Sequence, residues 1–239
     1  MEPSSREKIL EVAEARFAQR GFAGVGMREV ALAAGLGKSS LFHHFATKAD
    51  LWVAVIERVI ARIEAHALPA LQGKGGVLAQ IDRAVDALID ALAEHPTTAR
   101  LLLRSLVEED ELAAVEPPGA AAVEARIHAL VARFTSLLAA GVEAGELRPA
   151  SAPDAVQTLI GATVYHFASG EFGEAVLGGP LFSAEAVARR KREVKQLLLH
   201  GLASPQGLPG PARSTGLVPR SEPQASEDES RAPKETSPS

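Results

Sequence analysis

Apolar residues recur at intervals of three and four positions from residue 4 to residue 202, and this periodicity restricts the fold more than any other feature. The spacing is typical of one buried face on an α-helix. The strict apolar–polar alternation of a half-buried strand is missing, and alanine, leucine, glutamate and arginine dominate. We therefore expect an all-α protein with about nine helices and no strand.

Capping patterns and breakers divide this stretch into helices. Ser4 with Glu7 and Thr47 with Asp50 have the spacing of capping boxes, and Ser183 has the position of an N-cap. Glycine and proline interrupt the periodicity between them. The expected helices are 4–20, 27–34, 38–44, 48–67, 77–94, 97–110, 120–143, 154–169 and 184–202, with a loop over 170–182.

The composition excludes several classes of protein. The chain of 239 residues contains no cysteine, which removes disulfide frameworks, thiolate nucleophiles and cysteine zinc sites. The N-terminus lacks the apolar core of a signal peptide, and no apolar run approaches the roughly 20 residues that span a bilayer. We expect a soluble cytoplasmic protein that has no membrane contact and needs no cofactor.

The chain changes character after residue 202. Residues 203–239 contain no aromatic residue but seven of the fifteen prolines, many serines and the acidic cluster 227–229. Such a segment cannot bury enough apolar surface to offset the entropy of ordering it. We predict a disordered tail. It is either a plain solvated terminus or an acidic segment that modulates binding by the folded part of the chain, in competition with phosphate groups.

The segment "AGLGKSSLFHHF" (34–45) allows two interpretations. Gly37, Lys38 and Ser39 resemble the end of a phosphate-binding loop, but that loop needs a glycine where Leu32 stands and a preceding apolar strand. Here an amphipathic helix, 27–34, precedes it instead. A nucleotide-binding loop is therefore disfavoured.

A helix-turn-helix explains the same residues better. Two helices that cross steeply need a small residue at their contact and a tight turn between them, for which Ala31 and Gly35 are suited. The positions expected to be buried are Val30, Leu36, Leu41 and Phe45. Although the net charge is −5, residues 30–49 contain no acid, so this face can approach phosphate without repulsion.

Residues 9–52 resemble the TetR family of one-component transcriptional repressors. The matching positions include Phe17 with Gly21 and Phe22, the Val30–Gly35 turn, the Leu41–Phe45 block, and Lys48 with Asp50 and Leu51. The resemblance implies a DNA-binding three-helix bundle at 1–47 and a larger helical domain at 48–202 for ligand binding and dimerisation. Beyond residue 52 only the helical layout and the total length agree.

Two positions depart from the family's pattern. Val25 and Gly26 stand where the family places a Ser or Thr N-cap, and Phe42 stands where a tyrosine hydroxyl usually binds phosphate. The phenyl ring keeps an apolar face that could meet a thymine methyl group. We expect an atypical affinity or operator preference as a result.

The candidate DNA-binding residues follow from the outward face of the second helix of the motif and from the family's contacts. They are Gly37, Lys38, Ser39, Ser40, Phe42, His43, His44 and Lys48. Solvated helix surface is the alternative for the lysine and the serines, and a plain cap is the alternative for Gly37. The adjacent histidines lack further ligands, so we expect no metal site.

The resemblance also implies a pocket for a small-molecule effector among the middle helices. Candidate polar residues for it are Arg100, Arg104, His128, Tyr165 and His166. Two arginines at positions i and i+4 could hold an acidic ligand, or they could pair with Glu108 or solvent. Tyr165 and His166 lie on a helix that is equally suited to packing at a dimer seam.

The last two long helices are expected to form that seam. Gly161 and Ala162 permit close approach of another helix, beside Leu159, Ile160, Val164 and Phe167. The final helix contributes Val187, Val194, Leu197, Leu198 and Leu202. A symmetric dimer would present two recognition helices to half-sites about 34–36 Å apart in a palindromic operator.

The sequence thus predicts a homodimeric, ligand-responsive repressor without catalytic activity. An activator or a ligand-insensitive regulator of the same fold is an open alternative, because the sign of regulation depends on where the operator lies. A helical enzyme is a weaker alternative, since no zinc-protease motif or Ser/His/Asp spacing is present.

Overall fold

The computed structural model describes residues 4–107 and 117–202, and within these ranges every element is a helix. The elements, in chain order, are α1 (Ser5–Arg20), α2 (Met27–Ala33), α3 (Lys38–His44), α4 (Lys48–Leu71), α5 (Val77–Glu94), α6 (Thr98–Val107), α8 (Ala120–Glu143), α9 (Ala152–Ala168), α10 (Glu171–Leu177) and α11 (Ala184–Leu202). The expected all-α fold is confirmed. The predicted tail at 203–239 lies outside the described residues.

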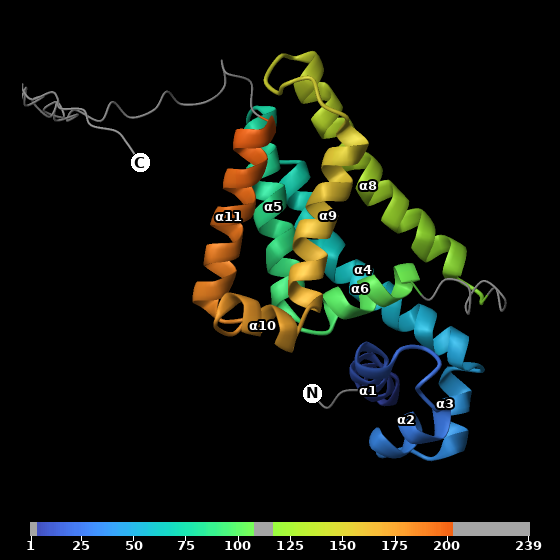
Figure 1. Cartoon of the computed structure of the whole chain (residues 1–239). Helices are drawn as coiled ribbons and strands as arrows, with labels where there is room; N and C mark the ends of the chain where they lie inside the picture. The colour runs from blue at the N-terminus through green and yellow to red at the C-terminus, as the bar shows by residue number, and fades with distance from the viewer. Residues whose placement is uncertain (1–3, 108–116, 203–239) are drawn as a thin grey trace, which may run out of the picture. The chain divides into compact units, whose positions relative to one another are not determined.

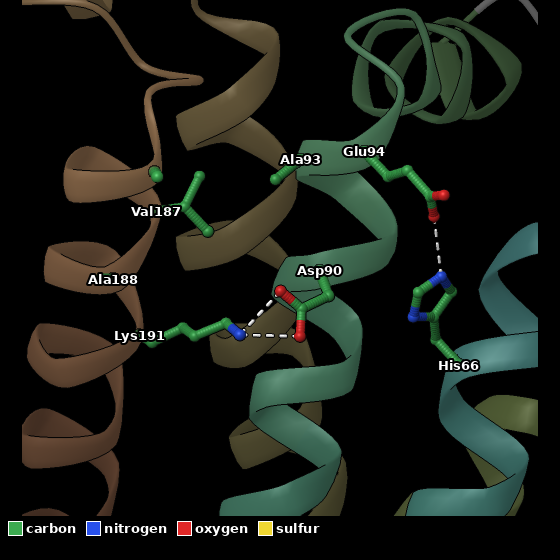
Figure 2. Close-up of a pocket in the computed structure, with 8 residues that line it drawn as sticks. His66, Asp90, Ala93, Glu94, Val187, Ala188 and Lys191 are labelled. Carbon is green, nitrogen blue, oxygen red and sulfur yellow. Dashed lines mark hydrogen bonds and ion pairs between the residues drawn. The ribbon is translucent and has the colours of Figure 1, made fainter.

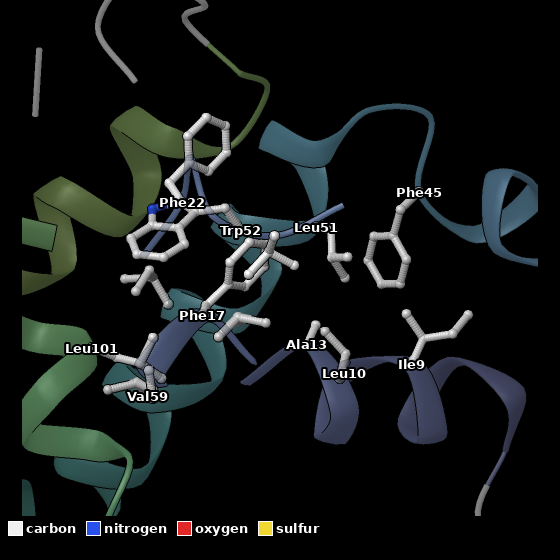
Figure 3. Packing of buried hydrophobic residues seen from close by; sticks show 14 of the residues in the cluster. Ile9, Leu10, Ala13, Phe17, Phe22, Phe45, Leu51, Trp52, Val59 and Leu101 are labelled. Carbon is white, nitrogen blue, oxygen red and sulfur yellow. The ribbon is translucent and has the colours of Figure 1, made fainter. Parts of the chain in front are cut away.

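The first three helices pack around the N-terminal half of α4 (Figure 1). Three aromatic side chains meet there, with the Trp52 ring edge-on to Phe17 at 5.0 Å and to Phe22 at 5.8 Å between centroids. Figure 3 shows these rings at one side of the cluster and Ile9 of α1 beside Phe45 at the other, with Leu51 of α4 between them. Such aromatic contacts add directional attraction to the burial of a large apolar area.

The same core continues into later helices. It includes Ala91 of α5, Leu101 of α6 and Val123 of α8, all of them buried. The chain therefore has no break in packing at residue 48, where α4 begins. A second core joins α5, α8, α9 and α11 around the fully buried Phe167.

The predicted start of α4 is confirmed in atomic detail. The Thr47 hydroxyl accepts a hydrogen bond from the Asp50 amide at 3.0 Å, and the Asp50 carboxylate accepts one from the Thr47 amide at 2.9 Å. The helix runs four residues past the expected end, through Pro69 to Leu71. Packing along α5 supports this extension, because α4 and α5 make the most extensive contact between two elements.

Two expectations about the later helices need correction. Residues 170–182, expected to be a loop, contain the short helix α10. Its start is set by Gly170, at φ +58°, and its end by Gly178, at φ +70°, conformations that glycine adopts without strain. The glycines at 170, 173, 178 and 179 and Pro180 are typical of a loop, which is why the sequence pattern missed the helix.

The second correction concerns the expectation that no apolar run approaches the length of a membrane-spanning helix. By length and composition alone α8 could cross a membrane, and it is the one such helix among the described residues. Core helices of soluble proteins pass the same test. The Arg126 guanidinium on α8 pairs with Glu64 of α4 at 2.6 Å, and α8 packs against α4, α5 and α9.

Candidate nucleic-acid interface

The turn between α2 and α3 has the geometry that a helix-turn-helix requires. Gly35 adopts φ +68°, and the Leu36 amide donates to the Ala31 carbonyl at 2.9 Å, which closes the turn. Val30 and Leu41 are fully buried and fix both helices to α1. The predicted buried positions are confirmed, with Leu36 only partly buried.

Most of the predicted DNA-binding residues lie on the outward face of α3. Gly37, Lys38, Ser39, Phe42, His43 and His44 are exposed, whereas Ser40 is partly buried. The Lys38 ammonium lies 5.6 Å from the centroid of the Phe42 ring, and the rings of His43 and His44 meet edge-on. The structure thus gathers cationic, hydroxyl and aromatic groups on one helix, in a region without carboxylates in sequence.

Lys48 belongs to the same end of the molecule but is held differently. Its ammonium lies 4.4 Å from the centroid of the Phe22 ring and 3.4 Å from the Ala23 carbonyl oxygen. These contacts fix the charge at the first turn of α4, beside the segment that joins α1 to α2. A cation held in place loses less side-chain entropy when it meets a phosphate.

The two departures from the family pattern have clear structural consequences. Gly26 caps α2 with no side-chain hydrogen bond, and Val25 before it is buried, so the cap contributes only its backbone. The Phe42 side chain is 39% exposed, which leaves its apolar ring on the face that carries the candidate contacts. The face therefore offers one hydroxyl fewer than a tyrosine would provide.

The acidic residue on α2 is neutralised by its neighbours. Glu29 forms one ion pair with Arg20 and another with Arg16, the latter at 2.9 Å. The hydrogen bond from Arg20 is the main reason why the pKa of Glu29 lies below its usual value. Both arginines belong to α1, so the pairs also fix α2 to α1.

A buried carboxylate that sequence reasoning missed joins this bundle to the rest of the chain. Glu14 of α1 is 6% exposed, and its two oxygens accept from both terminal nitrogens of Arg62 on α4 at 2.6 and 3.0 Å. The Thr97 hydroxyl, just before α6, donates to the same carboxylate at 2.6 Å. The signal was present, because Glu14 lies within the apolar stripe of α1 formed by Leu10, Ala13 and Phe17.

The electrostatics of Glu14 follow from this environment. Burial by itself raises the pKa of the carboxyl group, but the hydrogen bonds from Arg62 and Thr97 and the charges of Arg62 and Arg58 outweigh it. The net pKa lies below the usual value, so Glu14 is ionised at neutral pH. The Glu14 cluster, defined as Glu14, Arg58, Arg62 and Thr97, is therefore a charged link between α1, α4 and the start of α6.

Arg104, one of the predicted ligand residues, strengthens the same link. Its guanidinium donates to the carbonyls of Ala18 at 3.3 Å and Gln19 at 3.2 Å, in the last turn of α1. A cation there is stabilised by the unpaired carbonyls and the helix dipole. Arg100, one turn earlier, is exposed and lies beside Gly170, where an added Cβ would collide with its guanidinium.

The other candidate ligand residues lie on later helices, His128 on α8 and Tyr165 and His166 on α9. His128 and Tyr165 are exposed, on α8 and α9 respectively. His166 is partly buried, and burial together with the charges of Arg190 and Arg189 lowers its pKa to about 4. Its Nε2 atom is buried and has no hydrogen-bond partner among the described residues. A neutral imidazole is therefore expected at this position at physiological pH.

The structure shows an open cavity of about 540 Å³ between α4, α5 and α11. Figure 2 shows His66 of α4 hydrogen-bonded to Glu94 of α5 at 2.9 Å, and Lys191 of α11 paired with Asp90 at 2.6 Å. Ala93, Val187 and Ala188 provide its apolar lining. None of the five predicted ligand residues lines this cavity.

The residues predicted for a dimer seam divide into two groups. Most of the apolar ones, namely Leu159, Val164, Phe167, Val194 and Leu198, are buried within the chain's own second core. Gly161 and Leu197 are exposed, the latter at 67%, and no atom lies within 4 Å of a Cβ placed on Gly161. An outward face on α9 and α11 remains available to a partner.

A helix-turn-helix whose second helix exposes cationic and hydroxyl groups defines a DNA-binding protein. Residues 9–55 match the family model described as bacterial regulatory proteins, tetR family, and residues 78–198 match that of the tetracyclin repressor-like C-terminal domain. The chain therefore belongs to the TetR family of transcriptional regulators.

Named relatives and solved structures agree with this assignment. The HTH-type transcriptional regulator RutR of Escherichia coli K12 is 25% identical over 202 residues, which are 83% of this chain and 91% of RutR. The ketosteroid transcriptional regulator KstR2 of Mycobacterium tuberculosis superposes with a TM-score of 0.69 at 22% identity, over 85% of this chain and 97% of KstR2. AibR, in complex with isovaleryl coenzyme A and operator DNA, gives a TM-score of 0.66 at 17% identity, over 81% of this chain and 97% of AibR.

Proposed function

We propose that this protein is a cytoplasmic repressor that binds a palindromic operator as a homodimer and is released by a small molecule. The observation that carries the proposal is the outward face of α3, on which Lys38, Ser39 and Phe42 are exposed and no acid is present. Because the family's members are regulators and the chain shows no enzyme motif, no catalytic activity is part of the proposal.

The DNA contacts divide into two kinds. Lys38, Lys48, His43, His44 and the Gly37 amide are assigned to the phosphate backbone, which positions the domain on any sequence. Ser39, Ser40 and Phe42 are assigned to base edges in the major groove, where a hydroxyl can donate or accept and a ring can contact a thymine methyl. Specificity should therefore depend on the second group.

Release of DNA requires an effector that prefers the conformation unsuited to the operator. Helix α4 is the proposed transmitter, because it begins in the DNA-binding bundle at Lys48 and contacts α5 and α8 beyond it. The Glu14 cluster and Arg104 add a second connection through α6. Of the proposed ligand residues, His128, Tyr165, His166 and Arg100 are retained as candidates, and Arg104 is reassigned to this connection.

A gel-shift titration against the DNA that flanks the coding region tests the proposal. We expect a tight, competitor-resistant shift and a footprint with two-fold symmetry. The complex should dissociate with one member of an effector panel that includes isovaleryl coenzyme A, because that molecule binds the structural relative AibR. Random-sequence selection that yields no preferred DNA would overturn the proposal, and transcription that rises on binding would assign an activator instead.

A further inference from the structure

Large apolar side chains are exposed along three consecutive elements, α9, α10 and α11. Tyr165 of α9 is 56% exposed, Phe172 and Val176 of α10 are 65% and 68% exposed, and Leu197 of α11 is 67% exposed. Leu177, at the end of α10, is 44% exposed. Large exposed apolar side chains on consecutive elements are typical of a surface that contacts a protein partner.

Helix α10 is held firmly in this outward orientation. Gly173 is buried, and a Cβ placed there would collide with the Ser169 side chain and lie 3.4 Å from Leu181. The Leu181 amide in turn donates to the Glu174 carboxylate at 3.4 Å. Phe172 and Val176, one turn apart on the same helix, are exposed beside this buried position.

The neighbouring face of α9 can be covered at little electrostatic cost. From residue 155 to residue 170 the chain has no acidic or basic residue other than His166. Gln157, Thr158, Gly161 and Tyr165 are exposed at helical spacing on this stretch, and space around Gly161 is open. Because no ion must leave water, a helix can pack here without the penalty of burying a charge.

The charges on either side of this face are of opposite sign, and several of them form no ion pair among the described residues. Helix α10 carries Glu171 and Glu174 and no base, whereas α11 carries the basic run 189–192. Lys191 pairs with Asp90 and Arg190 donates to the Ala162 carbonyl, but Arg189, Arg192 and Glu171 have no ion pair in the part of the chain that the structure describes. Both complementary halves of an interface thus occur on one chain, which points to a second copy as the partner.

We propose that α10 is an arm of the homodimer interface, which packs Phe172 and Val176 against the second copy and places Glu171 near that copy's basic segment 189–192. The inference rests on the proposed homodimer and assigns to α10 a part in its affinity and pairing specificity. Apolar contact at the arm would supply affinity, whereas the flanking charges would select like copies among similar folds.

The first test measures the dimer dissociation constant by sedimentation velocity. Phe172→Asp and Val176→Asp should each raise the constant at least tenfold without changing the far-ultraviolet circular dichroism. Leu32→Asp is the matched control, because Leu32 is 82% exposed on α2, and it should leave the constant unchanged. An unchanged dimer dissociation constant in both α10 variants would overturn the proposal that α10 is part of the interface.

The second test exchanges the charges. Glu171→Lys alone and Arg189→Glu with Arg192→Glu should each weaken the homodimer severalfold by placing like charges together. An equimolar mixture of the two variants should form heterodimers preferentially, which mass spectrometry of the intact complex can count. A statistical distribution of homodimers and heterodimers would overturn the assigned charge contact.

A third set of variants separates failure of the arm from failure of the homodimer itself. Gly161→Trp and Leu197→Asp act on the proposed seam of α9 and α11, away from α10. If they dissociate the dimer and the α10 variants do not, the homodimer stands and the arm is rejected. A monomeric wild-type protein at micromolar concentration would reject both.

Discussion

The helix-turn-helix end of the molecule buries its aromatic residues, whereas the segment from α9 to α11 exposes aromatic and aliphatic ones. Phe17 and Trp52 are 0% and 2% exposed, and Phe42 is exposed on the face assigned to DNA. On the other segment Tyr165 and Phe172 are both more than half exposed. Apolar burial is the main favourable contribution to folding. The two regions therefore differ in how much of their apolar surface is buried by folding alone.

The first region completes its core within one chain and leaves polar groups for function. The second region places Phe167, Val194 and Leu198 in its own core and still has apolar surface left over. This exposed apolar surface contributes to stability only when another molecule covers it. The comparison indicates that the DNA-binding end completes its core against α5, α6 and α8 of the same chain, while α9, α10 and α11 retain exposed apolar surface.

The largest expected effect tests the contrast between the buried aromatic residues of the first region and the exposed ones of the second. Phe17→Ala should lower the free energy of unfolding by about 3–5 kcal/mol, because it removes a fully buried ring and leaves a cavity. Tyr165→Ala, at an exposed aromatic position, should cost the monomer less than about 0.5 kcal/mol. Urea unfolding at low protein concentration measures both, and similar losses would show that the two regions do not differ as described.

The second prediction concerns the charged link between the two regions. Glu14→Gln should lower the free energy of unfolding by about 1–3 kcal/mol, since it leaves the Arg62 guanidinium without its carboxylate. The pKa of Glu14 is lower in the folded chain than its usual value of 4.5, so the ionised carboxylate stabilises fully above that value. This stabilisation is lost as the pH falls below it.

Urea unfolding of both proteins between pH 7 and pH 3 provides the measurement. The difference between wild type and Glu14→Gln should be largest at neutral pH and shrink as the pH is lowered through the carboxyl range. Glu7→Gln is the control, because Glu7 is more exposed and pairs with Arg58 at 3.2 Å. A difference that stays constant with pH would show that the variant acts through packing alone.

The third prediction sharpens the assignment of roles at the DNA-binding end. Lys48→Ala should weaken binding to all sequences alike and reduce the slope of log affinity against log salt by about one. Ser40→Ala should leave that slope unchanged and alter preference at one or two base pairs. Fluorescence anisotropy at several salt concentrations, combined with selection on randomised operators, distinguishes these outcomes. Identical behaviour of the two variants would contradict the division into phosphate and base contacts.

The smallest expected effect tests the glycine that stands at the N-cap of α2 in place of the family's Ser or Thr. Gly26 has φ −102° and ψ 137°, and no atom lies within 4 Å of a Cβ placed on it. Gly26→Ser should therefore add a capping hydroxyl without strain and raise the free energy of unfolding by a few tenths of a kcal/mol, to about 1 at most. Thermal unfolding measures the gain, and Gly26→Ala controls for the loss of glycine flexibility.

The helix-turn-helix could be predicted from sequence because its determinants are local. The positive φ at Gly35, the buried Val30 and Leu41, and the reciprocal cap of Thr47 with Asp50 depend on residues a few positions apart. Long amphipathic helices such as α5 and α8 were predicted with their ends in place. The candidate DNA-binding residues followed from this spacing together with the contacts that the family resemblance implies.

Contacts between distant residues could not be predicted in this way. Glu14 meets Arg62 and Thr97 across 48 and 83 positions, and nothing in local spacing pairs them. Arg104 donates to the carbonyls of Ala18 and Gln19 across 86 and 85 positions, which local spacing could not indicate. Helix α10 was missed because the glycines within and around it, together with Pro180, are typical of a loop.

By itself the sequence determined the helical periodicity, the capping and the DNA-binding motif, because each depends on backbone preferences and on side chains within a turn or two. The tertiary structure decided which apolar residues remain after the core is filled, and hence that Leu198 is buried while Leu197 is exposed. It also decided which charges meet, since the partner of a buried carboxylate is chosen by how helices pack and not by their own sequence.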